Sequence, residues 1–326
     1  MPITKFYGGF NPAWRAGRLE REIVDNISDQ LALQYPDQNC VVAVPSWHEP
    51  SVLVDDIKNL NPDFTVICSL SDPLGPIEDL LDTIPGRVHK FGYVDHGIKF
   101  DFWALACLKF FKKYSREEII LKEFSKIYLN YNRKPHRHRL ELVNLFENSD
   151  LIKYGITTLG DSAYTLNESD DDYLEYGAND VMGDVGIPND IYSLGRLDIW
   201  NSTFLNIVSE TQYEYNPNAF ISEKIYKPII GLRPFIINGS PSIYKWLQNL
   251  GFDCFEDIFP VDKFKDESAP LGYKFRNHEL IAKVVQELTT KNLQDLYYKL
   301  LPRLEKNQIL FYEHARNQQL YSKFNI

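Results

Sequence analysis

Short apolar runs, each bounded by turn residues, alternate with helical patterns along this 326-residue chain. Residues 38–45, 64–70 and 203–209 form the clearest runs, and such continuous runs are typical of strands buried on both faces of a parallel sheet. Residues 17–35 carry apolar side chains at three- and four-residue spacing, as an amphipathic helix does. Strands that alternate with helices in this way predict βαβ units, and therefore an α/β fold with parallel sheets.

The length and the 44% hydrophobic content allow two domains, each with its own core. We expect the first domain over residues 1–118 and a second over 119–277. Leu and Tyr recur at helical spacing after that point, so we expect residues 278–326 to be helices that pack back across the domains. The acidic segment 160–198 has little periodicity and predicts a long surface excursion.

The charge and the cysteines restrict the class of protein. A net charge of −10 argues against a general nucleic-acid binder but allows a local basic pocket for a small anion. No apolar span of about 18 residues occurs and no secretory leader is recognisable, so we expect a cytoplasmic protein without a transmembrane segment. Four widely spaced cysteines predict buried free thiols in a reducing compartment. They are Cys40, Cys68, Cys107 and Cys254.

A basic loop follows the strand predicted to end at Leu129. Within the otherwise acidic chain, residues 133–139 hold three arginines, a lysine and two histidines. Arg139 lies at the start of the next helix, where its guanidinium and the helix dipole would bind a pyrophosphate together. The alternative is a solvated basic turn that balances the acidic excursion. The two histidines have no Cys or acidic partner at metal-ligand spacing, so we predict no zinc site.

Residues 220–240 predict a capped helix followed by a buried strand. Ser222 is a typical N-cap, Gly231 a typical helix stop, and 234–237 an apolar strand. Glu223 and Lys224 at the helix start supply what a nucleoside diphosphate needs, an acceptor for ribose hydroxyls and a cation. The alternative is an ordinary helix in which Glu223 forms an ion pair with Lys227 four residues on. We expect Lys224 to point away from this pair and to stay free for an anion.

A third polar residue, Glu210, follows the strand 203–209. A carboxylate at the carboxyl end of a parallel strand commonly faces a ligand, and an ordinary surface-loop glutamate is the alternative. Because ligands of open α/β sheets bind at the carboxyl ends of strands beside helix N-termini, we expect the basic loop, Glu210 and Ser222 to meet at one edge of the second sheet.

These pieces, in this order, resemble the donor-binding half of α1,3-fucosyltransferase-type glycosyltransferases. The family signature runs Phe-Glu-Asn, a spacer, Tyr-Ile/Val-Thr-Glu-Lys, a helix and a strand ending in Gly. The matching pieces here are Ser209-Glu210-Thr211, then 220–224, then Gly231 to Gly239, and the resemblance covers residues 125–260. Thr211 replaces the family's Asn, Phe220 replaces its Tyr, and the spacer is longer.

The resemblance implies a GT-B architecture, in which two Rossmann-like domains face a cleft and the C-terminal one holds the sugar nucleotide. It implies that Arg139 and Lys224 neutralise the diphosphate, that Glu223 accepts ribose hydroxyls, and that Glu210 shapes the sugar or ribose pocket. The remaining donor-site candidates are Asn132, Arg137, Ser222 and Tyr226. The departures leave sugar and nucleoside open, with a GDP-sugar favoured.

The expected reaction is an inverting, metal-independent transfer to a saccharide or other hydroxyl acceptor. Its general base would come from the first domain, and Glu49 and Asp95 follow predicted strands there, although such residues also cap helices. The run 170–172 contains an Asp-x-Asp pattern but lies in the acidic excursion, where a solvated charge run is the simpler interpretation. We therefore expect no metal and no other cofactor.

Two other functions fit parts of the pattern. A phage-type glycosyltransferase acting on modified DNA bases would share the donor domain, but it predicts a basic first domain, and residues 1–118 show no concentration comparable to 133–139. A non-catalytic protein that binds nucleotide sugars would keep the same site without turnover.

Overall fold

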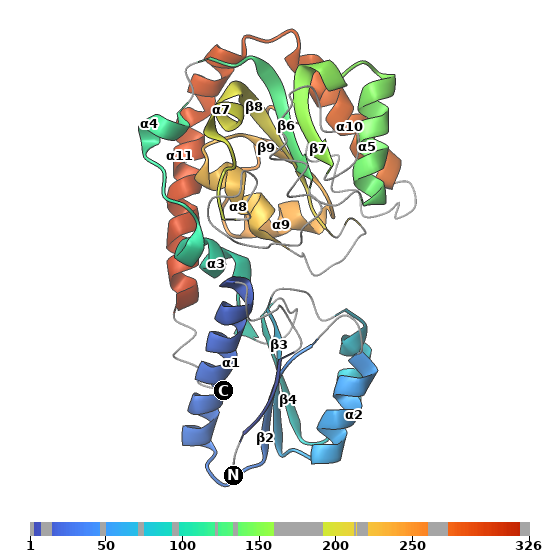
Figure 1. The fold of residues 1–326 in the computed structure, drawn as a ribbon, viewed down its shortest axis with the longest axis vertical. Coiled ribbons are helices and arrows are strands. Elements are labelled where there is room, and N and C mark those ends of the chain that lie inside the picture. Colours follow the sequence, from blue (N-terminus) through green and yellow to red (C-terminus); the bar gives the residue numbers. More distant parts are fainter. Residues whose placement is uncertain are drawn as a thin grey trace. The chain divides into compact units, whose positions relative to one another are not determined.

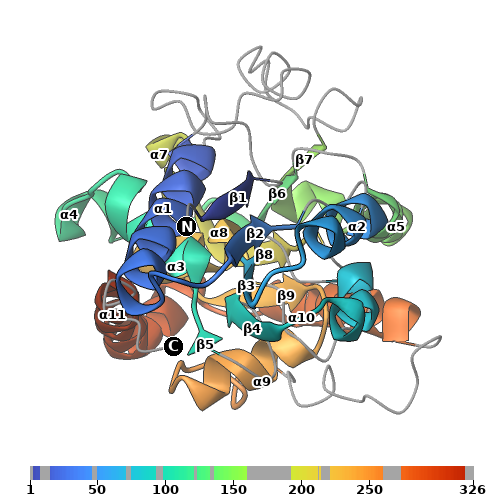
Figure 2. The same cartoon turned by 90° about the horizontal axis from the view of Figure 1, so that it is seen from below.

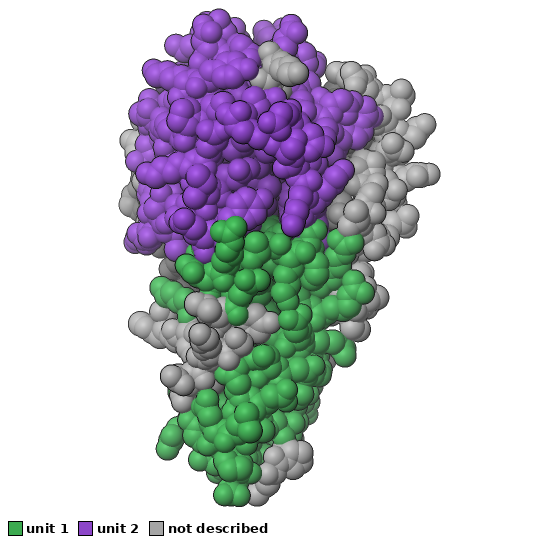
Figure 3. All heavy atoms as spheres, turned by 90° about the vertical axis from the view of Figure 1, so that its left-hand side faces the viewer, with its two compact units in different colours: residues 1–110, 314–326 green, residues 111–313 purple. Residues whose placement is uncertain are grey.

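The computed structural model describes most of the chain as two compact units. Unit 1 comprises residues 1–110 and 314–326, and unit 2 comprises residues 111–313 (Figure 3). Each unit is an α/β structure built on a parallel sheet. The described residues are 3–7, 15–45, 50–70, 75–92, 98–120, 123–132, 136–159, 192–211, 213, 221–259 and 273–319.

The sheet of unit 1 follows chain order. Its described strands pair in parallel as β1-β2-β3-β4-β5. Their bounds are β1 (Thr4–Tyr7), β2 (Cys40–Val44), β3 (Phe64–Ser69), β4 (Arg87–Gly92) and β5 (Ile98–Lys99). The predicted apolar runs are β2 and β3, and every residue of both is buried. Continuous burial confirms that these are inner strands covered on both faces.

Helices cover both faces of this sheet. Figure 2 shows α1 (Arg15–Gln34) and α3 (Phe102–Phe110) on one side and α2 (Pro50–Leu60) on the other. The 3-10 helix η1 (Gly75–Thr83) packs beside α2. Apolar side chains of β2 and β3 meet those of α2 and η1 in one core cluster, in which Ile67 is fully buried. Burial of such side chains is what stabilises this unit.

The sheet of unit 2 has a different order. Its described strands are β6 (Lys126–Asn132), β7 (Gly155–Leu159), β8 (Thr203–Ser209) and β9 (Phe235–Asn238). They pair in parallel in the order β7-β6-β8-β9. The chain leaves β6 for β7 on one side and then returns to β8 on the other side of β6. The carboxyl ends of β6 and β8 therefore form a topological switch point, the usual ligand position in such sheets.

Two helices on opposite faces begin at this switch point. The connections from β6 to β7 and from β8 to β9 run in opposite directions across the sheet, so right-handed crossovers put α5 (Arg137–Asn148) and α8 (Glu223–Ile230) on opposite faces (Figure 1). Helix α10 (Tyr273–Leu288) packs on α5, β6 and β9. The remaining described helices are α4 (Arg116–Ile119), η2 (Ile152–Tyr154), α7 (Leu197–Ser202), α9 (Ser242–Asn249) and α11 (Leu293–Asn317).

Local signals predicted several elements well. The strand 203–209 is β8, Ser222 is the N-cap of α8, with its hydroxyl accepting from Lys224 N–H, and Gly231 is the C-cap. The four cysteines are free and buried, as predicted. None of the helices in the described ranges is long and apolar enough to cross a membrane.

The sequence does not predict three strands and one strand end. The four residues of β1 are no longer than a turn, the two residues of β5 are too few to form a pattern, and β7 reads GITTL, with too few apolar residues to stand out from a loop. Strand β6 was expected to end at Leu129 but continues through Asn132. Its last polar residues pair with β7 and are buried, so tertiary pairing overrides their preference for loops.

Candidate functional site

Glu210 joins the end of β8 to the start of α8. Its side chain is completely buried, and its two carboxylate oxygens lie 2.9 and 2.7 Å from the Ser222 hydroxyl, which donates to them. The backbone N–H of Ser222 donates to the same carboxylate at 3.3 Å. One side chain therefore holds the N-cap of α8 against the carboxyl end of β8, and Glu210 is not a surface-loop residue.

Lys224 is the cation beside the Glu210 carboxylate. Its Nζ is 3.1 Å from the Ser222 hydroxyl oxygen, 3.1 Å from the Glu223 carboxylate and 4.0 Å from that of Glu210. The expectation that Lys224 points away from Glu223 is therefore wrong. Its side chain is only 27% exposed, and an ammonium with so little access to water is stabilised by pairing with the carboxylates beside it.

Arg139 approaches from the first turn of α5. It is buried, and its Nη2 donates to the backbone oxygen of Ser209 at 3.0 Å. Burial lowers the pKa of Arg139 to about 10, while the carboxylates of Glu210 and Glu223 act to raise it. The guanidinium therefore stays charged at neutral pH and faces the same two carboxylates as Lys224.

We refer to Arg139, Glu210, Ser222, Glu223 and Lys224 as the switch-point cluster. It brings together two cations, two carboxyl groups and a hydroxyl from α5, β8 and α8. Burial raises the pKa of Glu210, Lys224 lowers it, and Glu223 raises it again. Cations bind a diphosphate and carboxylates accept hydroxyl protons, so the cluster offers partners for both parts of a nucleoside diphosphate.

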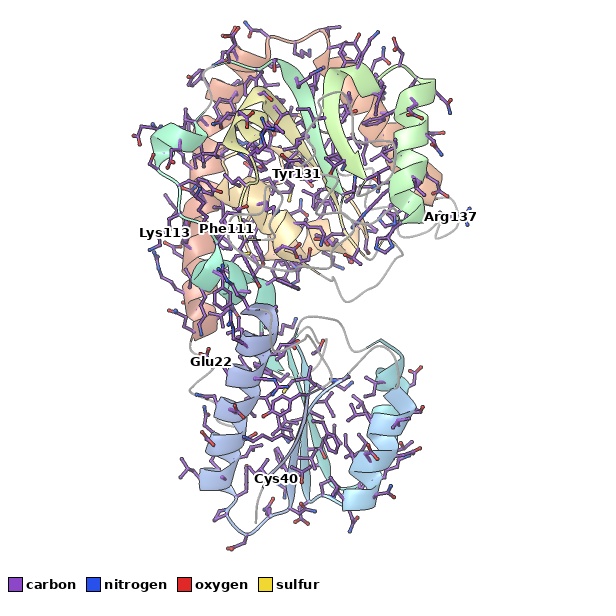
Figure 4. The ribbon with its side chains drawn as sticks, viewed as in Figure 1. Glu22, Cys40, Phe111, Lys113, Tyr131 and Arg137 are labelled. Atoms are coloured by element: carbon purple, nitrogen blue, oxygen red, sulfur yellow. The ribbon has the colours of Figure 1, made fainter. Side chains whose placement is uncertain are left out.

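Other candidates lie outside this cluster. The Arg137 side chain is 90% exposed, forms an ion pair with Glu141 at 2.7 Å, and points outward from α5 in Figure 4. Tyr226 is fully buried and its ring packs on Phe311 of α11 at 4.9 Å. Asn132 lies within β6 and donates to Asn130, so it sits in the sheet beneath the cluster. Glu49, Asp95 and the run 170–172 lie outside the described residues.

A stack of rings borders the cluster and was not predicted. The ring of Tyr213 lies between those of His138 and His278, with centroids 4.8 and 5.3 Å away. His138 Nε2 is 2.9 Å from the backbone oxygen of Glu210. Burial lowers the pKa of His138 to about 3 and that of His278 to about 4, so both rings are neutral at pH 7. The stack joins three segments far apart in sequence, and no local pattern signals it.

Within the described ranges, no group of three or more His, Cys, Asp and Glu side chains is arranged to hold a metal ion. Comparison of the chain with protein-family models, with curated proteins and with solved structures gives no match in any of the three. The features of this chain that bear on its function are therefore the switch-point cluster and the sequence signature of residues 209–239.

Proposed function

We propose that this protein is a metal-independent, inverting glycosyltransferase of GT-B architecture, which moves a sugar from a nucleoside diphosphate to a hydroxyl acceptor in the cytoplasm. The observation that supports it best is the switch-point cluster. Its charged side chains come from both helices that begin at the order reversal of the sheet, where nucleotides bind in folds of this type.

The contacts of its two cations predict how the switch-point cluster rearranges when a diphosphate binds. Arg139 is fixed by its bond to Ser209, whereas Lys224 is the more exposed cation and is held by side chains alone. An anion at the N-terminus of α8 attracts the Lys224 ammonium away from Glu223. That exchange weakens the pairing of the Glu223 carboxylate with Lys224, so that its oxygens can also accept ribose hydroxyls, while Glu210 continues to hold the N-cap.

The proposed reaction uses the same charges in its transition state. The acceptor oxygen attacks the anomeric carbon, the bond from that carbon to the diphosphate oxygen breaks, and the nucleoside diphosphate leaves. Arg139 and Lys224 stabilise the charge that develops on the leaving oxygen. The acceptor proton goes to a general base, for which Glu49 and Asp95 are the candidates.

The proposal is tested by binding and turnover of the wild-type protein. We expect one of GDP, UDP, ADP, CDP and dTDP to raise the melting temperature, because a ligand at about a hundredfold excess over Kd adds about 2.7 kcal/mol. The matching nucleotide sugar should then be consumed with a saccharide acceptor, and EDTA should not stop it. Binding without turnover of any nucleotide sugar would contradict the catalytic part, and the absence of binding would contradict the whole proposal.

A further inference from the structure

One face of the second sheet carries a row of polar side chains where an apolar layer is expected. The row consists of Asn130, Asn132, Ser209 and Asn238, all buried. Asn130 Nδ2 donates to the Ser209 hydroxyl oxygen at 3.0 Å, and Asn238 Nδ2 donates to it at 3.2 Å. Asn132 Nδ2 donates to Asn130 Oδ1 at 2.6 Å.

The row faces α5 and α10. Tyr128 packs its ring on Phe146 of α5 at 5.0 Å, and Asn130 and Asn132 follow it on the same face at two-residue spacing. Ser209 and Asn238 are paired in register across β8 and β9, and both reach this row through their hydrogen bonds. The carboxyl-end half of the sheet is therefore polar beneath these helices.

The hydrogen bonds of this region are incomplete. Asn132 Oδ1 and Asn238 Oδ1 are buried without a hydrogen-bond partner. On α10, neither amide atom of Asn277 nor Nε2 of His278 has a partner at normal hydrogen-bond geometry among the described residues, although only 1% of Asn277 is exposed. The polar group that acts on Asn277 is the Tyr213 hydroxyl, whose pKa burial raises and the amide lowers. In the described part of the unit 1 sheet, Thr65 Oγ1 is the only side-chain atom that is buried without a hydrogen-bond partner. Buried groups of this kind destabilise a fold unless an ordered water or a ligand completes their bonds, so the region can accept either.

The ring stack links these unfilled groups to the switch-point cluster. It starts at His138, which contacts the Glu210 backbone oxygen, passes through Tyr213, and ends at His278, the residue next to Asn277. A ligand that spans the length of the ring stack would place a charged group on the switch-point cluster and a planar polar group near Asn277. A nucleoside diphosphate has both, since its diphosphate is charged and its base is planar and polar.

We propose that Asn277 reads the base of the donor nucleotide, its amide donating to and accepting from one edge of the base. The inference rests on the proposed function and specifies its selectivity. A carboxamide matches a base edge that presents a donor beside an acceptor. His278 Nε2 lies one residue along the helix and supplies a further hydrogen-bonding group for the same base.

The test is Asn277→Leu, which removes both amide atoms at similar volume. Because these atoms make no hydrogen bond of normal geometry among the described residues and interact only with the Tyr213 hydroxyl, the variant should keep its melting temperature within about 2 °C of the wild type. Its affinity for the preferred nucleoside diphosphate should fall about tenfold to a hundredfold, and the ranking of GDP, UDP, ADP, CDP and dTDP should flatten. Its affinity for inorganic pyrophosphate, which contacts only the cluster, should not change.

Asn307 provides a matched control, because it is also a buried amide but has partners. Its Oδ1 accepts from Asp253 N–H and its Nδ2 donates to the Asp253 backbone oxygen, both at 2.8 Å. Asn307→Leu should lower the melting temperature and leave nucleotide affinity as in the wild type. If Asn277→Leu keeps the wild-type ranking while pyrophosphate still binds, the inference is overturned and the proposed function stands. If the wild type binds neither pyrophosphate nor any nucleotide, both are overturned.

Discussion

The two sheets of this protein share parallel pairing but differ in strand order. In unit 1 the described strands follow one another in chain order, and the inner strands β2 and β3 are almost entirely apolar. In unit 2 the order reverses between β6 and β8, and buried asparagines and a serine stand at their carboxyl ends. Where the order reverses, helices start on both faces of the sheet, so their polar first turns meet at one point.

We expect this difference to separate the residues that stabilise the fold from those that bind a ligand. Unit 1 buries apolar surface in its sheet, whereas unit 2 buries charged groups at both ends of its sheet. At the carboxyl ends these are the switch-point cluster. At the amino end, beside the start of β8, the buried cation is Arg233. The comparison predicts that the charge at the amino end carries stability and that the charges at the carboxyl ends carry function.

The largest expected effect on stability comes from Arg233→Met. The guanidinium donates to the backbone oxygens of Thr203 and Ile119 at 3.1 and 2.8 Å, and its removal leaves these buried acceptors without it. We expect the free energy of unfolding to fall by about 4 kcal/mol in urea titrations. Nucleotide affinity of the folded variant should be unchanged. A loss below about 1 kcal/mol would show that the amino-end charge is dispensable.

A smaller loss is expected from Ile67→Ala in unit 1. Ile67 is fully buried among apolar side chains of β2, α2 and η1, so truncation leaves a cavity. The free energy of unfolding should fall by about 3 kcal/mol, as measured by urea titration. The same loss should follow from Ile236→Ala, since Ile236 is equally buried in unit 2. A clearly smaller loss for Ile67 would contradict the view that unit 1 depends on its apolar sheet.

The third prediction concerns acid sensitivity in unit 2. The pKa of His278 is about 4 in the folded chain, against an ordinary value of 6.5. The unfolded chain therefore binds a proton first as the pH falls, and stability present above pH 6.5 is lost below it. Lowering the pH from about 7 to about 5 should cost the wild type about 2 kcal/mol through this residue, and His278→Phe should remove that share. If the free energy of unfolding falls equally with pH in the wild type and in His278→Phe, the prediction for His278 is wrong.

Much of the site could be predicted from the sequence because its signals are local. An apolar run marks β8, a hydroxyl residue before a helical pattern marks Ser222, and a glycine marks the helix end. Parallel strands all end at the same edge, so the meeting of Arg139 and Glu210 followed from their positions after two strands.

The rest depends on contacts between distant segments. Lys224 Nζ lies 3.1 Å from the Glu223 carboxylate and 4.0 Å from that of Glu210, and the second contact joins residues that a helical pattern alone does not bring together. The ring stack needs His278, which lies on a helix far along the chain from Tyr213. A sequence pattern predicts which polar residues follow each strand, but it does not predict which distant residues contact them.

The central claim is that the switch-point cluster binds a nucleoside diphosphate, and calorimetric titration of two variants tests it most directly. Lys224→Met removes a cation of the cluster, and Arg137→Met removes an exposed cation on α5 whose ion pair contributes little. We predict that the first loses about tenfold to a hundredfold in affinity for the preferred nucleotide, while the second stays within about twofold. Equal affinities in both variants would contradict the claim.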